Sequence, residues 1–166
     1  MHCISESVKD LTPAEVIFGS YVITTDVGKM DIAAIHHFLS KNSDWSRDIP
    51  LEKVKKSMEN SLNFGLLYKK KQIGFARVIS DFSTIAYLGD VYILKNYRGF
   101  GLSKKMMDFI IAHPGLQGLR RWILLTSTAE WLYEKYGFTM LPKPEIYMEK
   151  FNPNVYLNKE KTNADI

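Results

Sequence analysis

The residues best suited to chemistry form the run Arg98-Gly99-Phe100-Gly101-Leu102-Ser103, which joins an apolar segment to an amphipathic one. Its two glycines allow a tight turn in which successive backbone N–H groups converge. A helix that starts there adds unpaired N–H groups and a partial positive charge, and both favour phosphate oxygens. Arg98 and Lys104 flank the turn and either add charge-assisted hydrogen bonds or remain solvated cations. Residues 90–108 are therefore predicted to form a strand, a turn and a helix that bind the pyrophosphate of a coenzyme.

Three other motifs share features with this loop. A Walker loop requires Gly-Lys-Ser/Thr after four residues, and a dinucleotide fingerprint requires a third glycine where Lys104 stands. Arg98-Gly99-Phe100-Gly101 matches the start of an RNA-recognition signature, which continues as a strand whose aromatic rings stack on bases. Here Leu102, Met106 and Ile110 have helical spacing instead. RNA binding is therefore kept only as an outsider hypothesis.

The elements that must position this loop follow from the apolar pattern. Strands are predicted at 21–25, 64–68, 73–80, 85–94, 122–126 and 146–151, and helices near 31–41, 48–62, 102–112 and 127–137. Ser127 and Glu130 have the spacing of a capping box for the last helix. Gly89, inside an apolar strand, indicates a bulge or a close backbone approach. The order predicts one mixed α/β domain at 19–152, after an N-terminal extension at 1–18 and before a polar tail at 153–166.

Composition limits the classes of function. The chain has 166 residues, 46% of them hydrophobic, and a net charge of +4, which suits an anionic small ligand at least as well as nucleic acid. We expect a soluble cytoplasmic protein, because no long apolar stretch or secretion signal is visible. Cys3, the only cysteine, excludes a disulfide or a cysteine-based zinc site within one chain. His36 and His37 are interpreted as structural, and no metal is expected.

Two stretches of the sequence resemble the GNAT superfamily of acyl-CoA-dependent N-acetyltransferases. The run 98–103 is similar to the family's Arg/Gln-x-x-Gly-x-Gly/Ala loop, and 129–138 is similar to its Ala-x-x-Leu-Tyr-x-x-x-Gly-Phe stretch. Ser103 replaces a usual Gly or Ala, and Thr126 stands where asparagine is common. The resemblance spans 21–151. It implies an α/β (α+β) fold with a mixed, mostly antiparallel sheet of about six strands. About four helices flank this sheet, which is splayed between the fourth and fifth strands.

The resemblance also implies where acetyl-CoA, the cosubstrate, is bound. The pantetheine arm is expected to bond the backbone of the strand before the loop, and an N–H of that strand would stabilise the oxyanion of the reaction. The contacts implied are Val91, Tyr92, Ile93, Arg98, Gly99, Phe100, Gly101, Leu102, Ser103, Lys104 and Thr126. Tyr133 is expected to be the general acid that protonates the departing thiolate, with a buried core tyrosine as the alternative.

The acceptor side of the reaction is less defined by the sequence. Asp90 is the first candidate for the general base, because a carboxylate in an apolar strand needs a partner; structural hydrogen bonding in the bulge is the alternative. Trp45 and Arg47 are candidates for the acceptor pocket, or else belong to an exposed loop. The leading hypothesis is acetyl transfer to a primary amine of a small molecule or peptide. A non-catalytic CoA-binding or regulatory domain is the alternative. No membrane or nucleic acid partner is expected, and a homodimer is left open.

Overall fold

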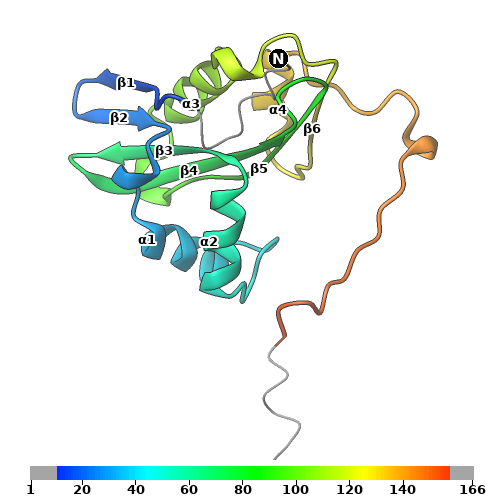
Figure 1. The fold of residues 1–166 in the computed structure, drawn as a ribbon, viewed down its shortest axis with the longest axis horizontal. Helices are drawn as coiled ribbons and strands as arrows, with labels where there is room; N and C mark the ends of the chain where they lie inside the picture. The colour runs from blue at the N-terminus through cyan, green and yellow to red at the C-terminus, as the bar shows by residue number, and fades with distance from the viewer. Residues whose placement is uncertain (1–10, 158–166) are drawn as a thin grey trace, which may run out of the picture.

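The computed structural model describes residues 11–157, which are built around one six-stranded sheet (Figure 1). Sheet order follows chain order, and all neighbouring strands are antiparallel except β5 and β6, which are parallel. The strands are β1 (Glu15–Phe18), β2 (Tyr21–Thr24), β3 (Leu62–Tyr68), β4 (Lys71–Ser80), β5 (Ile85–Ile93) and β6 (Arg121–Leu124). The α-helices are α1 (Ile32–His37), α2 (Leu51–Glu59), α3 (Leu102–Ile111) and α4 (Glu130–Tyr133). The predicted fold class, a mixed and mostly antiparallel sheet with flanking helices, is confirmed.

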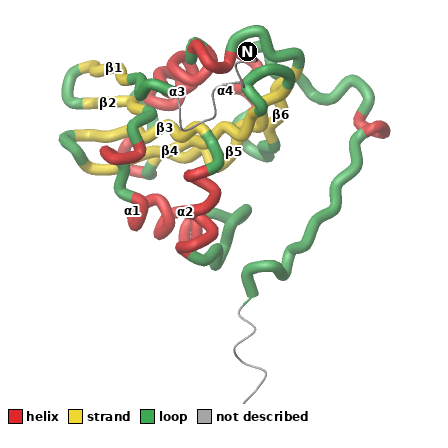
Figure 2. Tube along the Cα trace, viewed as in Figure 1, coloured by secondary structure: helices red, strands yellow, loops and turns green. Residues whose placement is uncertain are grey.

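Helices cover both faces of the sheet, as Figures 1 and 2 show. Helices α1 and α2 lie on one face and α3 and α4 on the other, and each face has its own apolar core. Phe64 of β3 pairs with Ala76 of β4, and both join the α3–α4 core. Phe75, the chain neighbour of Ala76, points to the opposite face and joins the α1–α2 core, because successive strand residues alternate between faces. No helix among residues 11–157 is long and apolar enough to cross a membrane.

The hairpin of β3 and β4 has a basic turn. Lys69 and Lys70 connect the strands, and Tyr68 pairs directly with Lys71. Both lysines have positive φ, +47° and +68°, as a two-residue type I′ turn requires. Both side chains are solvent-exposed, so the local charge repulsion is screened by water.

The structure differs from the sequence prediction at the two ends of the sheet-forming region. The sheet begins earlier than expected, because β1 precedes β2 and pairs with it, so the expected extension at 1–18 contains a strand in its last four residues. Residues 1–10, with Cys3, lie outside the described part of the chain. The strand predicted at 146–151 is absent: residues 138–157 form irregular chain with a 3₁₀ turn at Pro144–Ile146 and a further turn at 153–156 (Figure 2). Pro142 and Pro144 lack backbone N–H donors, which disfavours sheet pairing there.

Candidate functional site

The sheet opens between β5 and β6, which are the fourth and fifth of the strands predicted from the sequence. Their parallel pairing runs from Ile85↔Arg121 to Leu88↔Leu124 and ends there, whereas β5 continues to Ile93. On its other side β5 stays paired with β4, through Phe75↔Tyr92 and Gly74↔Ile93. One edge of the β5 backbone beyond Leu88 therefore has no β6 partner. An extended ligand with amide groups can complete this edge as a strand would.

The three residues predicted to bind through their backbone, Val91, Tyr92 and Ile93, lie in this unpaired stretch. The Tyr92 side chain belongs to the core, because its ring stacks on Phe38 with centroids 3.7 Å apart. Burial raises the pKa of the Tyr92 hydroxyl well above its ordinary value. Tyr92 can therefore offer a ligand only its backbone.

The loop after β5 has the backbone geometry of an anion site. Gly99 and Gly101 have φ of +85° and +75°, a region that side-chain-bearing residues avoid. Gly101 is the N-cap of the ten-residue helix α3 and has no side-chain cap. The first intrahelical bond runs from Lys105 N to Gly101 O, so the N–H groups of residues 102–104 have no intrahelical acceptor. These donors and the positive end of the helix dipole both face the space at the N-terminus of α3, where an anion would bind.

Arg98 fixes the loop to the end of β5. Its Nε donates a 2.8 Å hydrogen bond to the carbonyl oxygen of Ile93. The rest of the guanidinium is left to contact a ligand. Phe100, at the tip of the loop, is 69% exposed, which is unusual for an aromatic side chain on a rigid turn.

A further cation near this loop was not found from the sequence. The Lys104 ammonium lowers the pKa of Lys135 by charge repulsion, so the two side chains lie close together. Both are exposed, and together they form a concentrated positive charge beside the start of α3. No sequence signal links two lysines 31 positions apart, since only the packing of the helices brings them together.

Tyr133 is buried at the end of α4, where its ring packs edge-on against Phe138 with centroids 6.0 Å apart. Burial raises the pKa of its hydroxyl, so the phenol stays neutral at physiological pH. Tyr133 and Thr126 line a groove of about 510 Å³ that follows β6 and the extended chain after α4. The structure thus brings these two predicted site residues together.

Thr126 has a structural task that the predicted capping box does not describe. Ala129 is the N-cap of α4 and makes no side-chain cap, so the Ser127–Glu130 box is not formed. Instead the Thr126 hydroxyl oxygen accepts hydrogen bonds from the N–H groups of Thr128 (3.4 Å) and Ala129 (3.1 Å). Ser127 lies two residues before the N-cap position, so it is not the cap residue, and Thr126 stabilises the turn that leads into the helix.

A second group of predicted residues lies on the α1–α2 face of the sheet. Asp90 accepts a 2.8 Å hydrogen bond from Arg77 Nε at one carboxylate oxygen and a 3.1 Å hydrogen bond from Trp45 Nε1 at the other. Trp45 is 54% exposed. Arg47 does not join this group and instead pairs with Asp44 at 3.2 Å on the surface. Arg77 was missed by sequence reasoning.

Comparison with known proteins agrees with this geometry. A family described as "Acetyltransferase (GNAT) domain" matches residues 60–140. The chain is 32% identical to a Gibberella zeae protein named "Putative acetyltransferase FG08082", over 70% of this chain and 77% of that one. A crystal structure of a GNAT-family protein from Xanthomonas campestris is 48% identical, with a TM-score of 0.80 over 83% of this chain and 97% of that one. The chain belongs to the GNAT acetyltransferase family.

One structural neighbour of the chain is a GNAT protein whose structure contains bound acetyl-CoA. An Elizabethkingia anophelis GNAT acetyltransferase with acetyl-CoA has a TM-score of 0.56 at 14% identity, over 81% of this chain and 90% of that one. At this identity the likeness concerns the fold alone.

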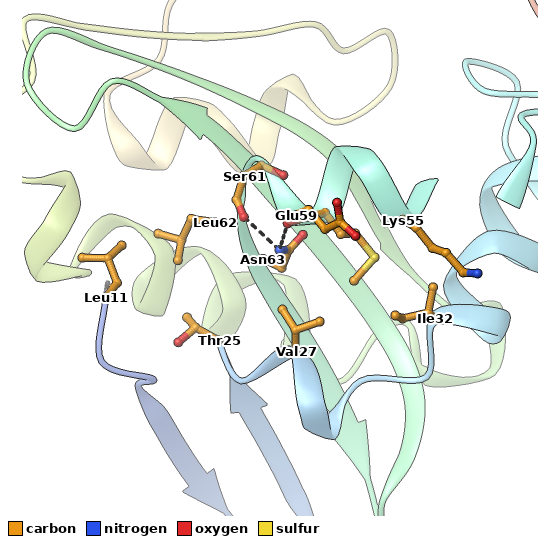
Figure 3. A pocket seen from close by; sticks show the side chains of 10 residues that line it. Leu11, Thr25, Val27, Ile32, Lys55, Glu59, Ser61, Leu62 and Asn63 are labelled. Atoms are coloured by element: carbon orange, nitrogen blue, oxygen red, sulfur yellow. Dashed lines mark hydrogen bonds between the residues drawn. The ribbon is translucent and has the colours of Figure 1, made fainter. Parts of the chain in front are cut away.

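This GNAT chain has another cavity, of about 420 Å³, between α2, the start of β3 and the N-terminal part of the described chain (Figure 3). Thr25, Val27, Lys55 and Asn63 are among its lining residues. None of the residues predicted for acetyl-CoA or catalysis lines it. We therefore assign it no part in the family reaction.

Proposed function

We propose that the chain transfers an acetyl group from acetyl-CoA to a primary amine of a small molecule or peptide. The observation that carries the proposal is the continuity of two features. The unpaired edge of β5 leads directly into the glycine loop at the uncapped N-terminus of α3. A backbone edge suits the amides of pantetheine, and the loop suits a pyrophosphate.

The residues present fit acetyl-CoA along this path. The backbone of Val91–Ile93 would bind the pantetheine arm. The loop from Arg98 to Ser103 and the Lys104 side chain would hold the pyrophosphate, and Lys135 adds positive charge beside them. The cosubstrate supplies the acetyl group as an activated thioester. Thr126 donates at most its hydroxyl hydrogen, since its oxygen is already engaged in the turn.

Tyr133 is proposed as the general acid. Because its pKa is raised, the Tyr133 hydroxyl stays protonated and can protonate the departing CoA thiolate. Packing against Phe138 fixes the position of the ring. Asp90 remains a candidate base only through lone pairs that are not engaged, because both of its oxygens accept hydrogen bonds. The proton of the acceptor ammonium can leave equally through water.

Acetyl-CoA titration by calorimetry, followed by CoA release with a panel of amines and peptides, tests the proposal. We expect binding at tens of micromolar or tighter, and thiol release with at least one acceptor. No acetyl-CoA binding would overturn the proposal. Binding without thiol release from any acceptor would instead indicate a non-catalytic CoA-binding domain.

The remaining sequence expectations are proposals with their own measurements. An RNA-binding module would show affinity that falls steeply with salt and is indifferent to CoA. The helix α3, where an RNA-recognition motif has a strand, argues against it. A cytoplasmic location is tested by cell fractionation, and a homodimer by sedimentation velocity.

A further inference from the structure

A bulge in β5 controls which side chains face the α1–α2 side of the sheet. The register between β4 and β5 shifts between Phe75 and Arg77, and Asp90 has φ of +55°, which is uncommon for a residue other than glycine. Leu88 joins the α3–α4 core, whereas Tyr92 joins the α1–α2 core. Without an extra residue, positions 88, 90 and 92 would share one face. The bulge therefore turns Asp90 toward α1 and α2.

Asp90 is held there by two different donors. Its side chain is only 11% exposed and that of Arg77 16%, so the 2.8 Å ion pair is partly shielded from water. With Arg77 on one oxygen, the other oxygen is directed to the indole N–H of Trp45, 45 positions earlier in the chain. The bond fixes an aromatic ring that lies in a surface loop between α1 and α2. A loop tryptophan whose indole N–H is fixed by a hydrogen bond and whose ring is half exposed offers a preformed surface for a ligand.

The anchored ring lies beside the place where the sheet opens. Asp90 lies two residues after Leu88, the last position of β5 that pairs with β6, and Val91 begins the stretch assigned to pantetheine. The Trp45 ring is also 6.5 Å from Phe38, which stacks on Tyr92 of the same strand. An acceptor that reaches the opening from the α1–α2 face would pass along Trp45.

We infer that Arg77 and Asp90 are positioning residues that hold Trp45 as a wall of the acceptor site, and that the acceptor is an amine on an apolar or aromatic body. The inference rests on the proposed function. An indole face binds apolar groups and ammonium ions. Arg77 forms an ion pair with Asp90, and Arg47 forms one with Asp44. Both arginines near this site therefore already have an anionic partner. A phosphate on the acceptor would have to compete with these carboxylates.

The positioning part is tested without any acceptor. The chain has three tryptophans, so the ¹⁵N-labelled protein gives three indole signals, and Trp45→Phe identifies the one that belongs to Trp45. Asp90→Asn should move this signal and leave the other two in place. Trp131→Phe is the matched control, because Trp131 is also 54% exposed. An unmoved Trp45 signal in Asp90→Asn would overturn the positioning role.

The specificity part uses 2-phenylethylamine and glucosamine 6-phosphate as probes at saturating acetyl-CoA. We expect acetyl transfer to 2-phenylethylamine, a KM for it about tenfold higher in Trp45→Ala, and a kcat within twofold of the original. Asp90→Asn should raise the same KM, keep the pH profile of kcat, and add little to Trp45→Ala in the double variant. Trp131→Phe should change neither constant.

Three results would overturn the inference. A kcat about 100-fold lower in Asp90→Asn at unchanged KM would make Asp90 the base instead. An unchanged KM in Trp45→Ala would remove the wall. Transfer to glucosamine 6-phosphate alone, or to neither probe, would refute the acceptor class. Acetyl-CoA titration of the unaltered protein, together with thiol release across the wider amine and peptide panel, separates these failures from failure of the proposed function. That function requires both acetyl-CoA binding and transfer to at least one acceptor, whatever its class.

Discussion

Replacing Gly101 with alanine separates the role of the glycine loop in binding from its role in folding. Gly101 has φ of +75°, and a Cβ built on it meets no atom within 4 Å, so the penalty is conformational and not a clash. Alanine in this region costs about 1–2 kcal/mol of unfolding free energy. Gly118 offers a matched control, since its φ is +72° and its Cβ position is equally open. Both variants should therefore lose similar stability in urea titrations.

Only Gly101→Ala should weaken acetyl-CoA binding. Alanine relieves its strain by rotating the backbone, and this turns N–H groups at the start of α3 away from the ligand. Losing one hydrogen bond to a charged group costs about 1.5–3 kcal/mol, which corresponds to roughly 10- to 150-fold in Kd. Calorimetry at one fixed salt concentration measures it. Equal acetyl-CoA affinity in Gly101→Ala and Gly118→Ala would refute the role of the loop in phosphate binding.

Three further predictions address the acid, the cation pair and the pH dependence of stability. Tyr133→Phe keeps the ring packed on Phe138 and removes the proton donor. The kcat should fall about 100-fold or more, while acetyl-CoA affinity stays within twofold. Unchanged turnover would exclude the acid role. Lys135→Ala should weaken acetyl-CoA binding roughly fivefold at low salt and much less at high salt. Lys53→Ala, which removes an exposed lysine of α2, should not weaken this binding. Equal effects of the two substitutions would indicate only non-specific attraction. Burial lowers the pKa of His113, so the unfolded chain takes up this proton at a higher pH than the folded chain does. The free energy of unfolding should therefore fall as pH drops below the ordinary histidine pKa of about 6.5. This residue contributes at most about 1.4 kcal/mol per pH unit to that fall. His113→Asn, measured by urea titration between pH 5 and 8, should remove this contribution, and an identical pH dependence in both proteins would contradict it.

The sequence by itself determined the features that depend on neighbouring residues. Gly99 and Gly101 occur where positive φ is needed, and the apolar spacing after them starts α3 at Leu102. The same local logic predicted the strands at 64–68 and 73–80, and a bulge or close backbone approach at Gly89, directly after which the β4–β5 register shifts. Such features follow from backbone sterics and side-chain periodicity within a few residues, so a single sequence contains the information.

The tertiary structure decided everything that depends on partners far apart in the chain. Residues 146–151 have a strand-like composition, but a strand also needs an edge to pair with, and the chain runs elsewhere after its prolines. Lys104 and Lys135 meet only because α3 and α4 share a face. Asp90 could be recognised as a buried carboxylate in need of partners, but Arg77 and Trp45 could not be named as those partners. Their contact requires the β4–β5 register, the bulge and the loop before α2 to be in place at once.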